Sequence, residues 1–121
     1  MSSLQVQLDR EWVRPGGTVR ARLHWELDDR PDKLVVRLLW YTEGRGTRDV
    51  GVIAEEELAF SGLTGDTEVE LAVPEGPYSF SGRLITLRWV VELAVEPEGE
   101  AEQAPLVVGP TPVPVQLVGS A

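Results

Sequence analysis

The sequence contains no cysteine among its 121 residues, and it has only one histidine. The lack of cysteine excludes disulfide bonds, thiolate catalysis and zinc–thiolate sites. A single histidine makes a transition-metal site improbable on ligand supply alone. We therefore predict no metal and no cofactor, and the residue types give no support to an oxidising compartment.

Long apolar runs and positive charges are also scarce. No segment approaches the roughly 20 apolar residues of a membrane-spanning helix. Residues 1–12 lack the basic and apolar regions of a secretory signal. Lysine and arginine number 11 against 20 aspartates and glutamates, which gives a formal net charge of −9. Because a negative field repels phosphate groups, we expect a cytoplasmic protein that neither binds nucleic acid nor inserts into a membrane.

The sequence has no helical periodicity, but it alternates strongly with a period of two. Between Thr18 and Asp28, apolar residues at odd positions alternate with polar ones, which is typical of a half-buried antiparallel strand. Leu4–Leu8, Thr67–Val73 and Ile85–Glu96 follow the same rhythm. The run Lys33–Thr42 is apolar on both faces, which predicts a central strand or one that is covered on its second face.

The remaining segments predict turns and less regular strands. Gly44–Gly46 is expected to form a hairpin tip before a strand over Thr47–Leu58. Pro97–Gln103 is expected to be an acidic surface loop, and Leu106–Val108 and Val113–Val118 are the last strand candidates. The prolines at alternate positions there favour a sheet edge. Seven to eight strands in a chain of this size predict one all-β sandwich domain over residues 1–121.

One stretch carries a resemblance to a known family. Val73-Pro74 is followed by Pro77-Tyr78-Ser79-Phe80-Ser81-Gly82, which has the pattern P-x-S-[FY]-x-G, and then by the alternating strand Ile85–Val91. In these residues the chain resembles the arrestin-like β-sandwich family. The resemblance implies an antiparallel immunoglobulin-like or arrestin-like sandwich and a non-catalytic scaffold or adaptor role. Arrestins pair two such sandwiches, whereas this chain has room for one, so we expect self-association in place of the second sandwich.

Aromatic residues supply the candidate contact sites. Tyr78 and Phe80 are two positions apart, so an extended backbone would point both the same way, as a plug over one end of the core or as anchors for a ligand. Trp12 lies just before a turn and is expected to be half-exposed, which makes it a further contact candidate. The other three tryptophans fall in phase with the apolar faces and are assigned to the core: Trp25, Trp40 and Trp89.

The leading functional prediction is a non-catalytic protein-interaction domain that binds a protein partner or a second copy. The alternative is a small-ligand or carbohydrate-binding module that uses exposed aromatics such as Trp12, Tyr78 or Trp40. We predict no enzyme and no catalytic residues, because His24 lies on the polar face of its strand without an orienting partner. The acidic group around Asp28 lacks the spacing of a calcium loop.

Overall fold

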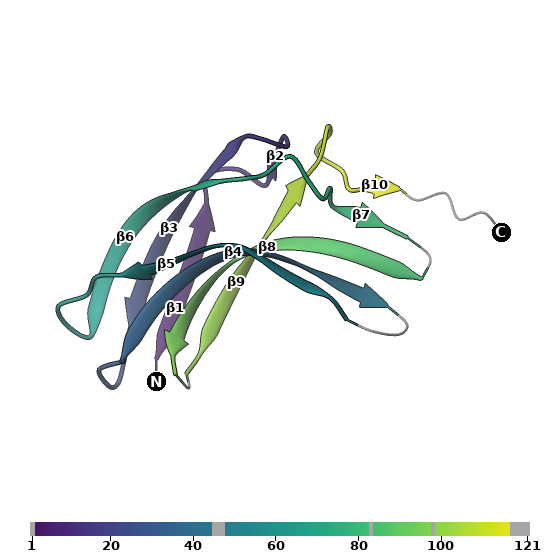
Figure 1. Cartoon of the computed structure of the whole chain (residues 1–121). Coiled ribbons are helices and arrows are strands. Elements are labelled where there is room, and N and C mark those ends of the chain that lie inside the picture. The colour runs from purple at the N-terminus through teal and green to yellow at the C-terminus, as the bar shows by residue number, and fades with distance from the viewer. Residues whose placement is uncertain (1, 45–47, 83, 98, 117–121) are drawn as a thin grey trace.

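The structure, a computed structural model, describes residues 2–44, 48–82, 84–97 and 99–116. In these ranges the chain forms ten β-strands in two sheets that face each other (Figure 1). Since the described residues form no helix, they include no helical membrane span. The strands are β1 (Ser3–Leu8), β2 (Trp12–Val13), β3 (Thr18–Glu26), β4 (Lys33–Gly44), β5 (Val50–Leu58), β6 (Thr64–Ala72), β7 (Phe80–Ser81), β8 (Ile85–Glu96), β9 (Ala101–Val108) and β10 (Val115–Gln116).

The small sheet has the order β1-β3-β6, and both of its strand pairs are antiparallel. The alternation predicted for β3 is confirmed, because its odd-numbered residues from Val19 to Trp25 are buried and Arg20 and Arg22 are exposed. His24 lies on the same polar face and is half-buried. This sheet therefore contributes one apolar layer and presents one polar layer.

The large sheet has the order β10-β7-β8-β4-β5, with β9 paired to β8 and β2 paired to β9. Its long strands pair in the antiparallel sense, and only the two-residue strands β2 and β10 pair in parallel. The strand β8 has two partners on one edge, since β7 pairs with Leu87 and Thr86 and β9 pairs with the segment from Trp89 onward. Figure 1 shows β4 and β8 curving out beyond the small sheet toward β7 and β10.

The core lies between the sheets and is closed where β1 runs beside β9 (Figure 1). Trp25 and Trp89 are buried and Trp40 packs against the core from a half-buried position, as the alternation predicted. Burial of such aromatic side chains supplies a large part of the stabilisation of a small domain. The predicted all-β antiparallel sandwich of immunoglobulin-like or arrestin-like build is confirmed, with seven strands of six residues or more among those described.

Each sheet places a tryptophan over a glycine on its outermost strand. Trp40 of β4 is paired with Gly51 of β5, and Trp25 of β3 is paired with Gly65 of β6. A Cβ atom would lie 2.3 Å from the Trp40 ring at Gly51 and 2.6 Å from the Trp25 ring at Gly65. The absence of a side chain at these two positions is therefore what lets the indole rings lie flat against the edge strands.

Two expectations need correction. The acidic segment Pro97–Gln103 was expected to be a loop, but β9 already begins at Ala101 because the backbone of Ala101–Leu106 pairs with β8. The final strand was expected over Val113–Val118, but the described part of it is only Val115–Gln116, and residues 117 and 118 lie outside the described residues. The expected hairpin tip also falls largely on residues 45–47, outside the described ranges.

Candidate functional site

The loop that carries the family resemblance is held to the end of β9 by Ser79. This serine is buried, with 3% of its surface exposed. Its backbone N–H donates to the Val108 carbonyl (2.7 Å), and its Oγ accepts the Val108 N–H (2.9 Å). Its carbonyl accepts the Val115 N–H of β10 (3.0 Å). Ser79 therefore satisfies backbone groups of two strands at once, which is a structural role.

The two aromatics beside Ser79 differ in burial. Phe80 begins β7 and packs against the core, whereas Tyr78 is 44% exposed. Phe80 therefore contributes to the predicted aromatic plug, whereas Tyr78 does not pack against the core. The neighbouring Pro77 carbonyl accepts a hydrogen bond from the Trp89 Nε1–H (2.9 Å). Phe80 thus closes this end of the core, and Tyr78 remains open to contact.

Trp12 is half-buried, as the sequence predicted, and it lies at the same end of the sandwich. Its Nε1–H donates to the Gly109 carbonyl (2.9 Å), and the Arg14 guanidinium lies 5.6 Å from its ring centre. The strand β2 that contains it pairs with Val107 and Val108 of β9. The structure therefore brings Trp12 and the Ser79 loop to one segment of β9, where both are used to hold strands together.

The aromatic residues do not form an open binding platform. Tyr78 is the exposed one among the eight aromatic side chains, all of which lie in the described ranges. Trp12, Trp40 and Tyr41 are half-buried. The carbohydrate-binding alternative needs several exposed, coplanar rings, so this arrangement does not favour it.

An open groove of about 1020 Å³ lies where β7 and β9 diverge from the edge of β8. Phe80 lines it, but Trp12 and Tyr78 do not. Its apolar lining includes Leu8, Tyr41, Phe80, Trp89 and Leu106, and its charged residues are Glu11, Glu43 and Arg88. Arg88 pairs with Glu43 across 3.4 Å, so the one cation among the described residues of the lining is already matched to a carboxylate.

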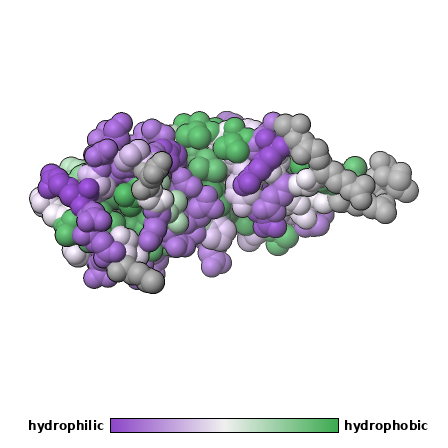
Figure 2. Space-filling view, turned by 90° about the horizontal axis from the view of Figure 1, so that it is seen from below, coloured by the Kyte–Doolittle hydropathy of each residue, from purple (hydrophilic) through white to green (hydrophobic). Residues whose placement is uncertain are grey.

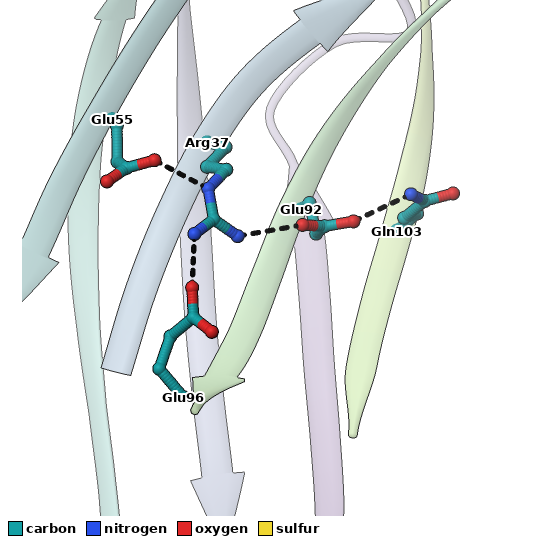
Figure 3. Close-up of polar contacts among 5 residues, drawn as sticks. All are labelled: Arg37, Glu55, Glu92, Glu96 and Gln103. Carbon is teal, nitrogen blue, oxygen red and sulfur yellow. Dashed lines mark hydrogen bonds and ion pairs between the residues drawn. The ribbon is translucent and has the colours of Figure 1, made fainter. Parts of the chain in front are cut away.

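A partly buried charge cluster lies on the outer face of the large sheet (Figure 3). Arg37 projects from β4, and its Nε donates to Glu55 of β5 (2.7 Å). Its two terminal nitrogens donate to Glu92 and Glu96 of β8, the first at 3.2 Å. Glu92 also accepts a hydrogen bond from Gln103 of β9 (2.8 Å), so the cluster spans four adjacent strands.

Burial makes this cluster stronger than an ordinary surface ion pair. The Arg37 and Glu92 side chains are 18% and 16% exposed. The hydrogen bonds to Glu55, Glu96 and Glu92 raise the pKa of the Arg37 guanidinium above its ordinary value, although partial burial acts in the opposite direction. The one sign of this cluster in the sequence is Arg37 itself, a charged residue inside an otherwise apolar strand. Its three carboxylate partners lie 18 to 59 residues away in the sequence, so no local pattern links them to Arg37.

Beside this cluster, the edge strand β5 exposes apolar side chains. Val50, Val52 and Ile53 are 56%, 53% and 40% exposed. Val50 and Val52 pair with Tyr41 and Leu39 of β4 and therefore lie on the same outer face as those residues. Figure 2 shows hydrophobic residues gathered at the surface between hydrophilic regions. This surface was not predicted from the sequence, because the alternation of β5 does not show whether another part of the protein packs on its apolar face.

The strand β5 is also an open edge. It ends the order of the large sheet and pairs only with β4 among the described strands. Ile53 forms a bulge, since Leu38 pairs with Ala54 and Leu39 with Val52. The second half of the strand is the acidic run Glu55–Glu57. Bulges and charges of this kind protect an edge from indiscriminate pairing, and the exposed apolar side chains of the edge are confined to its first half.

The described strands form an all-β sandwich of immunoglobulin-like or arrestin-like build, and comparison with solved structures agrees at the level of the fold. No protein-family model and no curated protein sequence matches the chain. Among solved structures, the chain is similar to Spo0M, a sporulation control protein from Bacillus subtilis, with a TM-score of 0.61 and 12% identity. The match covers 91% of this chain and 50% of Spo0M, so the chain spans half the length of that protein. At 12% identity, this likeness concerns the β-sandwich fold alone.

Two enzymes contain similar sandwiches as a small part of longer chains. The DNA glycosylase AlkC from Pseudomonas fluorescens matches with a TM-score of 0.50 and 17% identity over 89% of this chain and 30% of its own. A β-glucosidase from Listeria innocua matches with a TM-score of 0.51 and 14% identity over 95% of this chain and 16% of its own. Likeness at such identity concerns the fold alone, since one sandwich fold serves many functions.

Proposed function

We propose that this chain is a non-catalytic protein-interaction domain of the arrestin-like type, and that it binds a protein partner through the β5 edge of its large sheet. The observation that carries the proposal is the open edge with three exposed apolar residues, Val50, Val52 and Ile53. A strand edge offers unpaired backbone groups to an incoming strand, and apolar side chains beside it add contact area.

Two further observations support a binding role over a catalytic one. His24, the one histidine of the chain, lies on the outer face of the small sheet and does not line the groove. Among the described residues, no group of three histidine, cysteine, aspartate or glutamate side chains has the arrangement of a metal site. The likeness to Spo0M, whose name describes a control protein, agrees with a regulatory role.

Affinity capture with matched variants tests the proposal. Val50→Thr with Val52→Thr keeps the β-branched shape of both exposed side chains but makes the edge polar. The control, Glu68→Gln with Glu70→Gln, changes two exposed residues on the β6 edge of the small sheet. We expect at least one protein to be retained by the wild-type and control chains and reduced on the order of tenfold by the β5 variant, as mass spectrometry would quantify. Equal capture by all three chains would refute binding through β5.

A further inference from the structure

The exposed side chains of β5 divide the strand into an apolar half and an acidic half. Val50 and Val52 lie in the first half, and Glu55–Glu57 fill most of the second. Glu55 is bound to Arg37, whereas Glu56 and Glu57 make no ion pair with any described residue and are exposed. The edge therefore offers an apolar contact followed by two carboxylates that have no cation of their own in the described structure.

The two available carboxylates point to opposite faces of the sheet. Glu57 pairs with Val35 and lies on the outer face with Glu55, whereas Glu56 pairs with Val36, whose side chain is in the core. A strand added to β5 also alternates its side chains between the two faces. Two adjacent basic residues on such a strand would consequently reach one carboxylate each.

A second copy of the chain is a poor occupant of this edge. Added antiparallel over the same residues, it would place each Glu55–Glu57 run opposite the apolar half of the other β5, and it would bring a second net charge of −9. The carboxylates would then gain no cation across the strand pair, and net charge of one sign disfavours association. Charge complementarity therefore selects a basic strand over a second β5.

From these observations we infer that the partner of β5 is an extended, basic peptide segment of another protein that adds to the sheet as a new antiparallel strand. It carries adjacent lysines or arginines in its first half, opposite Glu57 and Glu56, and apolar β-branched residues in its second half, opposite Val52 and Val50. A segment matching the nine residues of β5 is about 30 Å long. This inference rests on the proposed function and adds the chemistry of the partner.

Synthetic peptides test the inference without a known partner. The probe is Lys-Lys-Lys-Thr-Val-Thr-Val-Thr, and its matched control replaces the three lysines with glutamates. A second control, Lys-Lys-Lys-Thr-Pro-Thr-Pro-Thr, keeps the charge but lacks the backbone N–H donor at the two positions where the probe has valine. Backbone amide shifts of the isotopically labelled chain report both the site and the affinity. We expect the shifts that the lysine probe causes to centre on β5, with affinity lower on the order of tenfold for each control at low salt.

A charge-reversed chain tests whether the lysine probe binds only because the protein carries a net negative charge. The double variant Glu56→Lys with Glu57→Lys alters two exposed side chains and should bind the glutamate peptide in preference to the lysine probe. Equal binding of the lysine and glutamate peptides, shifts centred on another edge, or no shift at any concentration would each overturn the inference. If affinity capture still depends on Val50 and Val52 while the lysine probe does not bind β5, then the proposed function stands and only the chemistry of the partner is wrong.

Discussion

The two sheets use the same residue types on their outer faces but bury them differently. On the small sheet, Arg20 and Arg22 pair with Glu68 and Glu70 across 3.3 to 3.8 Å, and all four side chains are 44% to 71% exposed. On the large sheet, Arg37 gathers three glutamates and is 18% exposed. Exposed pairs contribute little to stability, whereas a partly buried cluster is costly to break.

The same contrast extends to the other polar groups. In the large sheet and its loops, the hydrogen bond between Val108 and Ser79 is buried, and the hydrogen bond between Trp89 and Pro77 is partly buried. In the small sheet, the Trp25 Nε1–H is buried and makes no hydrogen bond with any described residue. The small sheet thus relies on apolar packing, while the large sheet adds buried polar contacts that fix how β4, β8 and β9 lie. A sheet that presents an edge to a partner gains from such a fixed geometry.

The largest expected difference between the sheets comes from removing one arginine from each. Arg37→Leu leaves Glu92 and Glu96 without their cation and should lower the free energy of unfolding by about 2–3 kcal/mol, allowing for the partial exposure of the cluster. Arg20→Leu should cost less than about 1 kcal/mol. Urea denaturation measures both values, and equal losses would remove the proposed contrast.

Removing the Ser79 hydroxyl should have the next largest effect. Ser79→Ala leaves the buried Val108 N–H without its acceptor, which should cost about 1–3 kcal/mol in the same denaturation experiment. The control is Ser81→Ala, because the Ser81 hydroxyl makes no hydrogen bond with a described residue; we expect a change within about 0.5 kcal/mol. A similar cost for both serines would show that Ser79 does not hold the loop to β9.

A smaller difference should separate the two buried tryptophans. Both Trp89→Phe and Trp25→Phe remove the same volume from the core, but only the first loses a hydrogen bond. Trp89→Phe should therefore be more destabilising by about 1–2 kcal/mol, the cost of leaving the Pro77 carbonyl without a partner. Thermal unfolding of the two variants shows which substitution lowers stability more. A larger loss of stability for Trp25→Phe would contradict this prediction.

The smallest expected effect is the response to salt. Raising sodium chloride from about 0.1 M to about 1 M shortens the screening length from roughly 10 Å to 3 Å. The already small cost of Arg20→Leu should vanish, whereas most of the cost of Arg37→Leu should persist because burial limits screening. Unfolding curves at the two salt concentrations measure the cost of each substitution. If the costs of Arg37→Leu and Arg20→Leu both disappear at high salt, the Arg37 cluster is as hydrated as the surface pairs.

The period of two was enough to predict the sandwich, because each long strand carries its own alternation. β3 and β8 were predicted to within two residues, and the core positions of Trp25 and Trp89 followed from their phase. β9 was predicted only over Leu106–Val108, because its earlier residues are small or polar and become a strand by pairing with the backbone of β8. Tertiary pairing of this kind overrides local composition.

The candidate surface was much harder to predict than the fold. Whether Val52 is buried depends on what lies beyond the edge of the sheet, which no local pattern encodes. The Arg37 cluster depends on the register of three strands, with Glu92 located 55 residues away in the sequence. By contrast, the half-exposure of Trp12 was predicted correctly from its place before a turn, although its indole hydrogen bond to Gly109 was not.

The central claim is that the β5 edge, and not the β6 edge, contacts the partner. A photo-crosslinking amino acid at position 52, compared in living cells with the same group at position 70, tests it most directly. We predict a discrete crosslinked protein from position 52 that is absent from position 70. Crosslinks from position 70 alone, or the same crosslinked species from both positions, would contradict the account.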